Sequence, residues 1–310
     1  METSIEERNI KEITVTYHKK RELSKLLKGV LFIAPSLLLF TVFTFYPFIR
    51  NIVQSFYLSD STGKLTMFVG LDNYLSLFQN SVFKKSLLNT FIYMVITVPI
   101  TILISFMLTV LSNLKLKGMR IYQICFTVTM GVSVAAGSVF FSFLYHPTAG
   151  VLNKIILGFG FKSVDFLTNP NIALLSIAAI SIWMNIGFAY LILNGGIKNI
   201  DSSYYESADI VGGGFWYRLR KITIPLLSPS LFFVLTISII HSFQTFGVID
   251  MLTKGGPNNA TNLLVYSLYK DAFVNFQFGS AAAQGVILFL IIFLISRIQT
   301  KLTERWVTYQ

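Results

Sequence analysis

The sequence predicts an all-α integral membrane protein with about six transmembrane helices and both termini in the cytoplasm. Of its 310 residues, 54% are hydrophobic and only 13% are charged, whereas a soluble domain carries about a quarter charged residues. The mean hydropathy is +0.65. Apolar runs recur along the chain, and each is long enough to cross the hydrocarbon core of a bilayer as a helix. The length fits one continuous unit, so separate soluble domains are not required.

The apolar runs are expected to be helices, because within a bilayer a helix satisfies all its backbone polar groups internally. The six expected spans are residues 29–49, 88–112, 121–144, 172–194, 229–249 and 279–297. Pro35 and Pro47 should kink the first span, and Pro99 the second, at positions where neighbouring helices can compensate. Mostly polar residues precede the first run, so a cleavable signal peptide is not expected.

The distribution of Lys and Arg predicts the orientation in the membrane. The N-terminal tail, the loop between spans two and three, the loop between spans four and five, and the C-terminal tail together hold 17 of the 25 basic residues. These four segments should therefore be cytoplasmic. The net charge of +11 is then mostly attracted to the anionic inner leaflet, and a nucleic-acid partner is not expected.

Small residues recur in the third span, at 131 and 135–137, and in the sixth, at 280–283 and 285. Such residues let helices approach closely in lipid, either in internal packing or in a contact with another subunit. The single Cys125 excludes a disulfide framework.

The loop 195–228, between the fourth and fifth spans, carries the most informative pattern. Ser203 and Glu206 have the spacing of a capping box, so a helix should begin there. The glycines at 212–214 should end or sharply turn it, since glycine adopts positive φ without steric cost. A second short helix is expected over 215–222. This helix–turn–helix knob could dock in a groove of a cytosolic partner.

The same loop resembles the EAA loop of permease subunits in binding-protein-dependent ABC importers. The matching residues are Glu206, Ala208, Gly212, Ile222, Ile224, Pro225 and Pro229. Two positions depart from the family pattern, since Ser207 replaces an Ala and Val211 replaces an Asp.

The resemblance implies that the loop is a coupling helix seated on a separate ATPase subunit. The residues that it assigns to this contact are Glu206, Ser207, Ala208, Gly212, Ile222 and Pro225. Glu206 would pair with a basic residue of the ATPase, or else serve only in the capping box. Pro225 should start a new segment that leads back into the membrane.

Further stretches extend the resemblance over about residues 28–310. Residues 68–74 and 252–266 are similar to the carbohydrate-uptake branch of the family, which includes the maltose-type permeases. Residues 246–250, 280–284 and 307–310 are similar to the A-type permeases of sn-glycerol-3-phosphate uptake systems.

This family likeness implies the type I ABC importer permease fold and several partners. These are a second permease subunit in a heterodimer, two ATPase subunits that bind ATP and Mg, and an extracytoplasmic solute-binding protein. Within the outer loop 250–278, Gly255, Gly256 and Pro257 would contact that binding protein, or else form only a turn. No cofactor and no metal site are expected in this chain.

The expected organisation has four parts. Residues 1–28 form a basic cytoplasmic tail, 29–85 the first span and an outer loop, 86–297 the transport domain with the coupling loop, and 298–310 a cytoplasmic tail.

Polar side chains in the fourth and fifth spans predict a solute path, because polar groups that face lipid are costly. The predicted path residues are Asn185, Phe188, Ser238, His241, Ser242, Gln244 and Thr245. Ser238, Ser242 and Thr245 have the i, i+4, i+7 spacing of one helical face. By position, all but His241 and Gln244 are similar to the sugar-facing residues of the maltose-type permeases.

His241 is the one basic group within a span. It either contacts a phosphate-bearing solute or forms a hydrogen bond between helices. Alternatively, the permease holds the solute weakly and the external binding protein provides the specificity.

The favoured function is therefore an ATP-driven importer permease in the cell membrane, for sn-glycerol 3-phosphate or a glycerophosphodiester, with a di- or oligosaccharide as the alternative. The sequence has no G-x-x-x-x-G-K-[ST] motif, so ATP hydrolysis should occur in partner subunits. A membrane-embedded enzyme would need more clustered acids or histidines than Asp250 and His241. An ion channel would need a selectivity ring or an Arg-rich helix.

Overall fold

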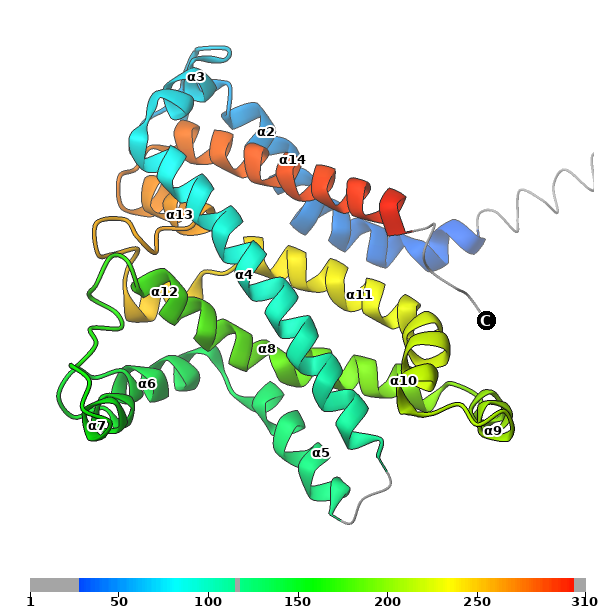
Figure 1. Ribbon diagram of the computed structural model, residues 1–310. Helices are drawn as coiled ribbons and strands as arrows, with labels where there is room; N and C mark the ends of the chain where they lie inside the picture. Colours follow the sequence, from blue (N-terminus) through cyan, green and yellow to red (C-terminus); the bar gives the residue numbers. More distant parts are fainter. Residues whose placement is uncertain (1–27, 115–117, 304–310) are drawn as a thin grey trace, which may run out of the picture. The chain divides into compact units, whose positions relative to one another are not determined.

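The computed structural model describes residues 28–114 and 118–303, and the chain divides into two units, residues 1–53 and 54–310 (Figure 1). The predicted basic tail up to residue 27, the basic residues Lys115 and Lys117, and the stretch 307–310 lie outside the described residues.

In the first unit, one helix runs from Lys28 and ends at Gln54, the first residue of the second unit. A π turn, Thr41–Phe45, interrupts its regular α geometry, and the last part is α2, Tyr46–Gln54. The Tyr46 N–H donates to the carbonyl of Thr41, five residues earlier. This wider turn comes directly before Pro47, which has no N–H to donate.

The second unit begins with a short hairpin that sequence patterns did not predict. Strands β1, Tyr57–Ser59, and β2, Leu65–Phe68, pair antiparallel. In the turn between them, the Asp60 carboxylate accepts hydrogen bonds from the N–H groups of Thr62 and Lys64, each at 2.9 Å. The pKa of Asp60 is lowered, chiefly by a hydrogen bond from the Thr62 hydroxyl. Thr62 and Lys64 therefore stabilise the charged form of the Asp60 carboxylate, and these bonds hold the turn of the hairpin.

The remaining elements of the second unit are helical. They are α3, Asp72–Gln79; α4, Ser81–Ser112; α5, Met119–Thr127; the 3-10 turn η2, Val128–Gly131; α6, Val134–Leu144; α7, Val151–Gly158; α8, Ala173–Lys198; α9, Ser202–Ile210; α10, Phe215–Arg218; the π turn η3, Leu219–Thr223; α11, Ile224–Phe243; α12, Gly247–Leu252; α13, Leu264–Phe273; and α14, Phe278–Thr303.

Within the described residues, five helices are long and apolar enough to cross a membrane: Lys28–Gln54, Ser81–Ser112, Ala173–Lys198, Phe215–Phe243 and Phe278–Leu302. The bent pair Ile121–Gly131 and Val134–Leu144 makes six if it is counted as one span. The predicted set of about six helical spans is thus confirmed, and α4 continues through Pro99 without a break.

The predicted third span, 121–144, is wrong as a straight helix, because its two halves meet at 104°. Val132 and Ser133 are extended at this break. The Ser133 hydroxyl caps α6 by accepting a hydrogen bond from the Ala136 N–H at 3.2 Å. A serine cap restarts the helix in a new direction where an uninterrupted apolar run had suggested continuity.

Both predicted ends of the fifth span, 229–249, are also wrong. The helix ends at Phe243, and α12 starts separately at Gly247. In the other direction the helical run continues back to Phe215, although the segment α11 itself begins at Ile224. Pro225 lies in the first turn of α11, after the π turn η3, and the Ile224 N–H donates to Leu219. This π turn lets the chain continue into the proline without leaving the helix.

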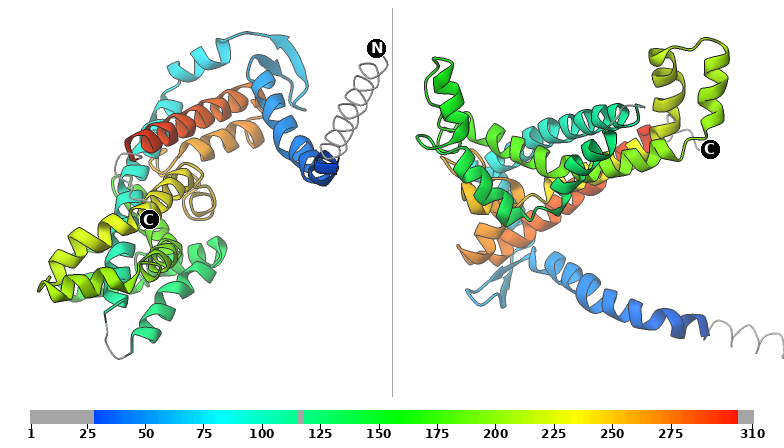
Figure 2. Two further views of the ribbon diagram at one scale, coloured as in Figure 1. Left: turned by 90° about the vertical axis from the view of Figure 1, so that its right-hand side faces the viewer. Right: turned by 90° about the horizontal axis from the view of Figure 1, so that it is seen from below.

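The apolar core lies where α4, α8 and α11 pack along one another. Leu193 of α8 packs with Leu227 and Val234 of α11, next to Ile102 and Phe106 of α4. A second cluster links α4 and α8 to α6 and α12. At one end of α8 and α11 the segments α9 and α10 project as a hairpin, away from α7 and α13, which lie at the other end (Figures 1 and 2).

Candidate functional site

A small polar cavity lies between the middles of α4 and α8 and the last two turns of α11. Its lining residues are Tyr93, Thr97, Val98, Thr101, Ser181, Asn185, Ser238, His241, Ser242 and Thr245. Five of the seven predicted path residues therefore come together. Phe188 and Gln244 do not line the cavity: Phe188 is half-buried elsewhere on α8, and Gln244 is the exposed residue at the end of α11.

Thr245 reaches this cavity for a different reason from the one predicted. The helix ends before it, so Ser238, Ser242 and Thr245 do not share one helical face. The chain turns at Gln244, and the Thr245 hydroxyl donates back to the carbonyl of His241 at 3.0 Å. This turn keeps Thr245 beside the last turn of α11.

Sequence reasoning missed the wall that α4 provides. Tyr93, Thr97 and Thr101 follow one another at intervals of four residues, which places them on one face of α4. That spacing of hydroxyl residues inside an apolar helix was the available signal. Ser181, one turn before Asn185 on α8, was also missed.

Four polar side chains of the cavity, Thr97, Asn185, Ser242 and Thr245, donate to a carbonyl of the preceding turn. Asn185 Nδ2 donates to the carbonyl of Ser181 at 2.7 Å, and Ser242 Oγ donates to that of Ile239 at 2.7 Å. Their oxygens consequently remain as acceptors. The buried hydroxyls of Tyr93 and Ser181 lack a hydrogen bond of normal geometry within the described residues, although Tyr93 lies beside Ser181 and Thr245. The cavity thus offers both acceptors and donors, as a polyol or sugar requires.

Size and charge limit what this cavity can hold. None of its ten lining residues is Asp, Glu, Lys or Arg, so His241 is the one lining side chain that can carry a positive charge. The cavity measures about 20 Å³, which admits a water but no larger solute. The cavity of this chain by itself is therefore too small to enclose a sugar or a phosphate ester.

The predicted knob is present, but its helix begins two residues earlier than expected. The Asp201 carboxylate caps α9 by accepting a hydrogen bond from the Ser203 N–H at 2.8 Å. This bond lowers the pKa of Asp201. The capping box of Ser203 and Glu206 is therefore wrong, because both residues lie within the helix. Glu206 also forms no ion pair among the described residues, so its carboxylate stays exposed and available.

The glycine turn of the knob is confirmed. Gly212 has a φ of +70°, a backbone angle that residues other than glycine rarely adopt. The Gly213 N–H donates to the carbonyl of Ala208 at 2.7 Å, which closes the end of α9. At the tip of the knob, Ile210 and Val211 are 86% and 73% exposed.

The other residues that were assigned to coupling differ in exposure. Ser207 and Gly212 are exposed, Ala208 is buried, and Ile222 and Pro225 are half-buried. A groove of about 560 Å³ separates the knob from the ends of α4 and α8, and Glu206, Asp209 and Arg218 are among its lining residues.

The loop with Gly255, Gly256 and Pro257 is anchored on α4. Gly255 is buried, and a Cβ there would lie 3.1 Å from the Tyr266 ring. The carbonyl of Gly256 accepts a hydrogen bond from Thr261 at 2.6 Å. Lys85 Nζ donates to the carbonyl of the neighbouring Asn258, also at 2.6 Å. Among these, Asn258 is exposed, whereas Gly256 and Pro257 are half-buried.

Comparisons with known proteins agree with this architecture. Residues 67–308 match the family described as "Binding-protein-dependent transport system inner membrane component". The chain is 32% identical over 281 residues to the sn-glycerol-3-phosphate transport system permease protein UgpA of Yersinia pestis, which covers 90% of this chain and 95% of that protein. It is equally similar, over 280 residues, to the UgpA protein of Agrobacterium fabrum, with the same coverage.

A solved structure shares the fold. The crystal structure of a bacterial alginate ABC transporter, in complex with an alginate pentasaccharide-bound periplasmic protein, contains a chain that superposes with a TM-score of 0.78 at 22% identity. The match covers 93% of this chain and 96% of that one. By the family match over residues 67–308 and the 32% identity to UgpA, the chain belongs to the family of inner-membrane components of binding-protein-dependent transport systems.

Proposed function

We propose that this chain is one of two permease subunits of an ATP-driven ABC importer for sn-glycerol 3-phosphate or a glycerophosphodiester. The observation that carries this proposal is the connection between the knob and the cavity. The knob joins the end of α8 to the start of the helical run that contains α11. The middle of α8 and the far end of α11 line the polar cavity. A force on the knob would therefore move two of the cavity's three walls.

The partners follow from what this chain leaves incomplete. A second permease subunit would provide the opposite wall of the solute site. Two ATPase subunits would bind ATP and Mg and receive the knob, with Glu206 paired to a basic residue. An extracytoplasmic binding protein would deliver the solute near the loop around Gly256 and Pro257. Binding proteins are implied by the family description, and one is present in the alginate complex.

The names of the relatives support glycerol 3-phosphate as the solute. His241, in its protonated form, is the cavity's candidate for contacting a phosphate. A di- or oligosaccharide is the second candidate, because the other lining groups are neutral and rich in hydroxyls.

The solute can be tested by uptake in a strain that lacks this gene, with and without the gene restored. Labelled glycerol 3-phosphate, a glycerophosphodiester and maltose-type sugars should be compared at equal concentrations. We expect restoration of phosphate-ester uptake alone. Restoration of sugar uptake alone would favour the second candidate, and restoration of neither would reject both solutes.

The coupling role is tested by Gly212→Asp. This change places a side chain and a charge at the left-handed turn of the knob, so the altered knob should fit its partner poorly. We expect the permease to remain in the membrane, while ATPase co-purification and uptake fall at least tenfold.

Gly214→Asp is the matched control, because Gly214 has an ordinary φ of −67° at the N-cap of α10, where Asp is a favourable residue. Normal uptake and ATPase retention in Gly212→Asp would contradict the proposed coupling role.

A further inference from the structure

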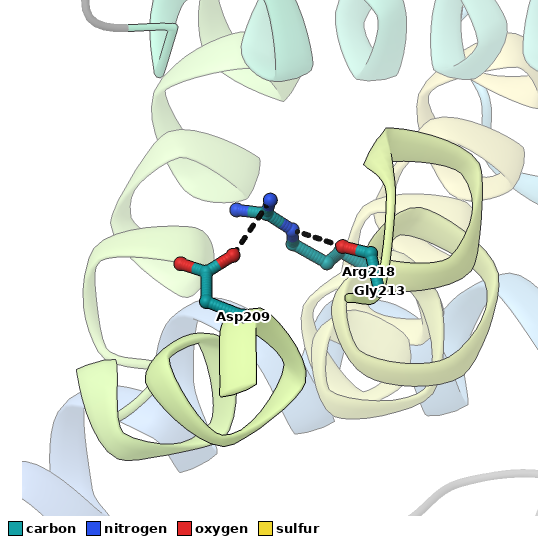
Figure 3. A network of polar contacts seen from close by, with 3 residues as sticks. All are labelled: Asp209, Gly213 and Arg218. Carbon is teal, nitrogen blue, oxygen red and sulfur yellow. Dashed lines mark hydrogen bonds and ion pairs between the residues drawn. The ribbon is translucent and has the colours of Figure 1, made fainter. Parts of the chain in front are cut away.

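Arg218 connects three parts of the knob through one side chain (Figure 3). Its Nη2 lies 2.7 Å from the Asp209 carboxylate on α9. Its Nε donates to the carbonyl of Gly213, in the turn, at 2.8 Å. Arg218 itself is the last residue of α10. The planar guanidinium thus links the first helix, the turn and the second helix with two donors in a fixed geometry.

The glycine turn packs closely on Ala208 and Tyr217 at Gly213, but not at the glycines on either side. A Cβ at Gly212 or at Gly214 would meet no atom within 4 Å, so the turn is open on both sides. The Gly213 N–H to Ala208 bond closes α9, and a hydrogen bond between the Tyr205 and Thr223 hydroxyls at 3.1 Å spans the base of the knob. At the tip, Arg218 is the side chain that bridges the two arms.

The two acidic residues of the knob are used differently. Glu206 and Asp209 both line the groove beside Arg218. Asp209 pairs with Arg218, whereas Glu206 has no ion-pair partner among the described residues. The Arg218 guanidinium therefore stabilises the knob itself, and the Glu206 carboxylate can bind another protein.

We propose that Arg218 is a positioning residue, which holds α9 at a fixed angle to α10 so that force on α9 passes into α11. An exposed ion pair contributes little to global stability. Its effect here is local, because a turn that bends under load would absorb the movement before it reached the cavity. This inference rests on the proposed coupling function.

The test uses the complete complex in lipid nanodiscs. With Cys125 changed to Ser, spin labels at the exposed positions Ser203 and Lys221 report the distance distribution between the two arms of the knob. Arg218→Gln and Asp209→Asn break the ion pair from opposite sides. Arg218→Lys keeps the charge but cannot make both contacts. Arg220→Gln is the matched control, since Arg220 lies over the Trp216 ring, 5.9 Å from its centroid.

We expect a narrow distribution for the unmodified knob and for Arg220→Gln, and clearly broader distributions for the three variants of the pair. In the same complexes in liposomes, the amount of solute moved per ATP hydrolysed should fall several-fold for these variants. A purely structural role would reduce the amount of complex but leave that ratio unchanged.

Distributions of unchanged width in Arg218→Gln and Asp209→Asn would overturn the proposal. Broader distributions with an unchanged solute-to-ATP ratio would overturn the link to coupling. Failure of the proposed function would give a different result, because no ATPase would co-purify with the unmodified chain. The width of the spin-label distance distribution could still be measured in the permease alone.

Discussion

At the scale of single residues, Asp201 determines where the knob begins. Its carboxylate bonds the Ser203 N–H, and that bond lowers its pKa. A group with a lowered pKa in the folded state contributes stability above the pKa of the unfolded chain, near 3.8, and loses it as the pH falls through the folded value.

Changing Asp201 to Ala should therefore loosen the start of α9 at neutral pH. We expect several-fold faster hydrogen exchange in a peptide that covers residues 201–210, because the Ser203 N–H loses its acceptor. Asp201→Asn should keep the slow exchange of the parent at neutral pH, since Asn also caps helices. In acid, the parent should exchange faster because its carboxylate is protonated, whereas Asp201→Asn should show no such change. Equal exchange in all three proteins would exclude Asp201 as the cap.

Side chains of the cavity provide a second test at this scale. Ser242 lines the cavity, whereas the neighbouring Gln244 does not. Ser242→Ala should raise the solute concentration that gives half-maximal uptake about tenfold. This is the effect expected from the loss of one hydrogen bond of about 1–1.5 kcal/mol. Gln244→Ala should change that concentration less than twofold. The reverse order, measured from uptake against solute concentration, would remove the cavity from the solute path.

At the scale of elements, the broken third span depends on a close approach from α8. A Cβ at Gly187 would contact Thr129 Oγ1 and would lie 2.9 Å from the carbonyl oxygen of Phe126 and 3.0 Å from the N of Met130. Backbone atoms cannot rotate away as a side chain can. The helix α8 can therefore pack this closely against α5 and η2 only because residue 187 is glycine.

Gly187→Ala should destabilise the protein by roughly 1–3 kcal/mol, the usual cost of overpacking a filled interface. Gly195→Ala, on the same helix, has no atom within 4 Å of the added Cβ, so it should be neutral or slightly stabilising. Thermal unfolding in detergent, followed by tryptophan fluorescence, compares the two. Similar midpoints would show that α5 and η2 can move aside.

At the scale of the whole molecule, the positive-inside prediction concerns which face of the membrane carries the knob. Val211 lies at the tip of the knob and Ser61 in the turn between β1 and β2, and both are exposed. In a Cys125→Ser background, an impermeant maleimide should label Val211→Cys only after the cells are lysed. It should label Ser61→Cys in intact spheroplasts. Labelling of residue 211 from outside would invert the topology and exclude contact between the knob and a cytoplasmic ATPase.

The spans could be predicted from the sequence because the bilayer imposes a simple rule on it. Runs of about 20 apolar residues must be helices in lipid, and five of them are helices here without interruption by a sharp bend. The glycine turn of the knob was also predictable, since positive φ at Gly212 is a local property of the chain.

Tertiary structure alone decided where helices break and which polar residues meet. The bend at Ser133 occurs within an apolar stretch, where hydropathy contains no signal. The end of α11 before Gln244 occurs among polar residues, which the sequence predicts to be the wall of a solute path inside a continuous helix. The cavity combines Tyr93 of α4 with Ser181 of α8 and Ser238 of α11, which lie far apart in the chain. Periodicity within one helix shows which side chains share a face, but packing determines which faces come together.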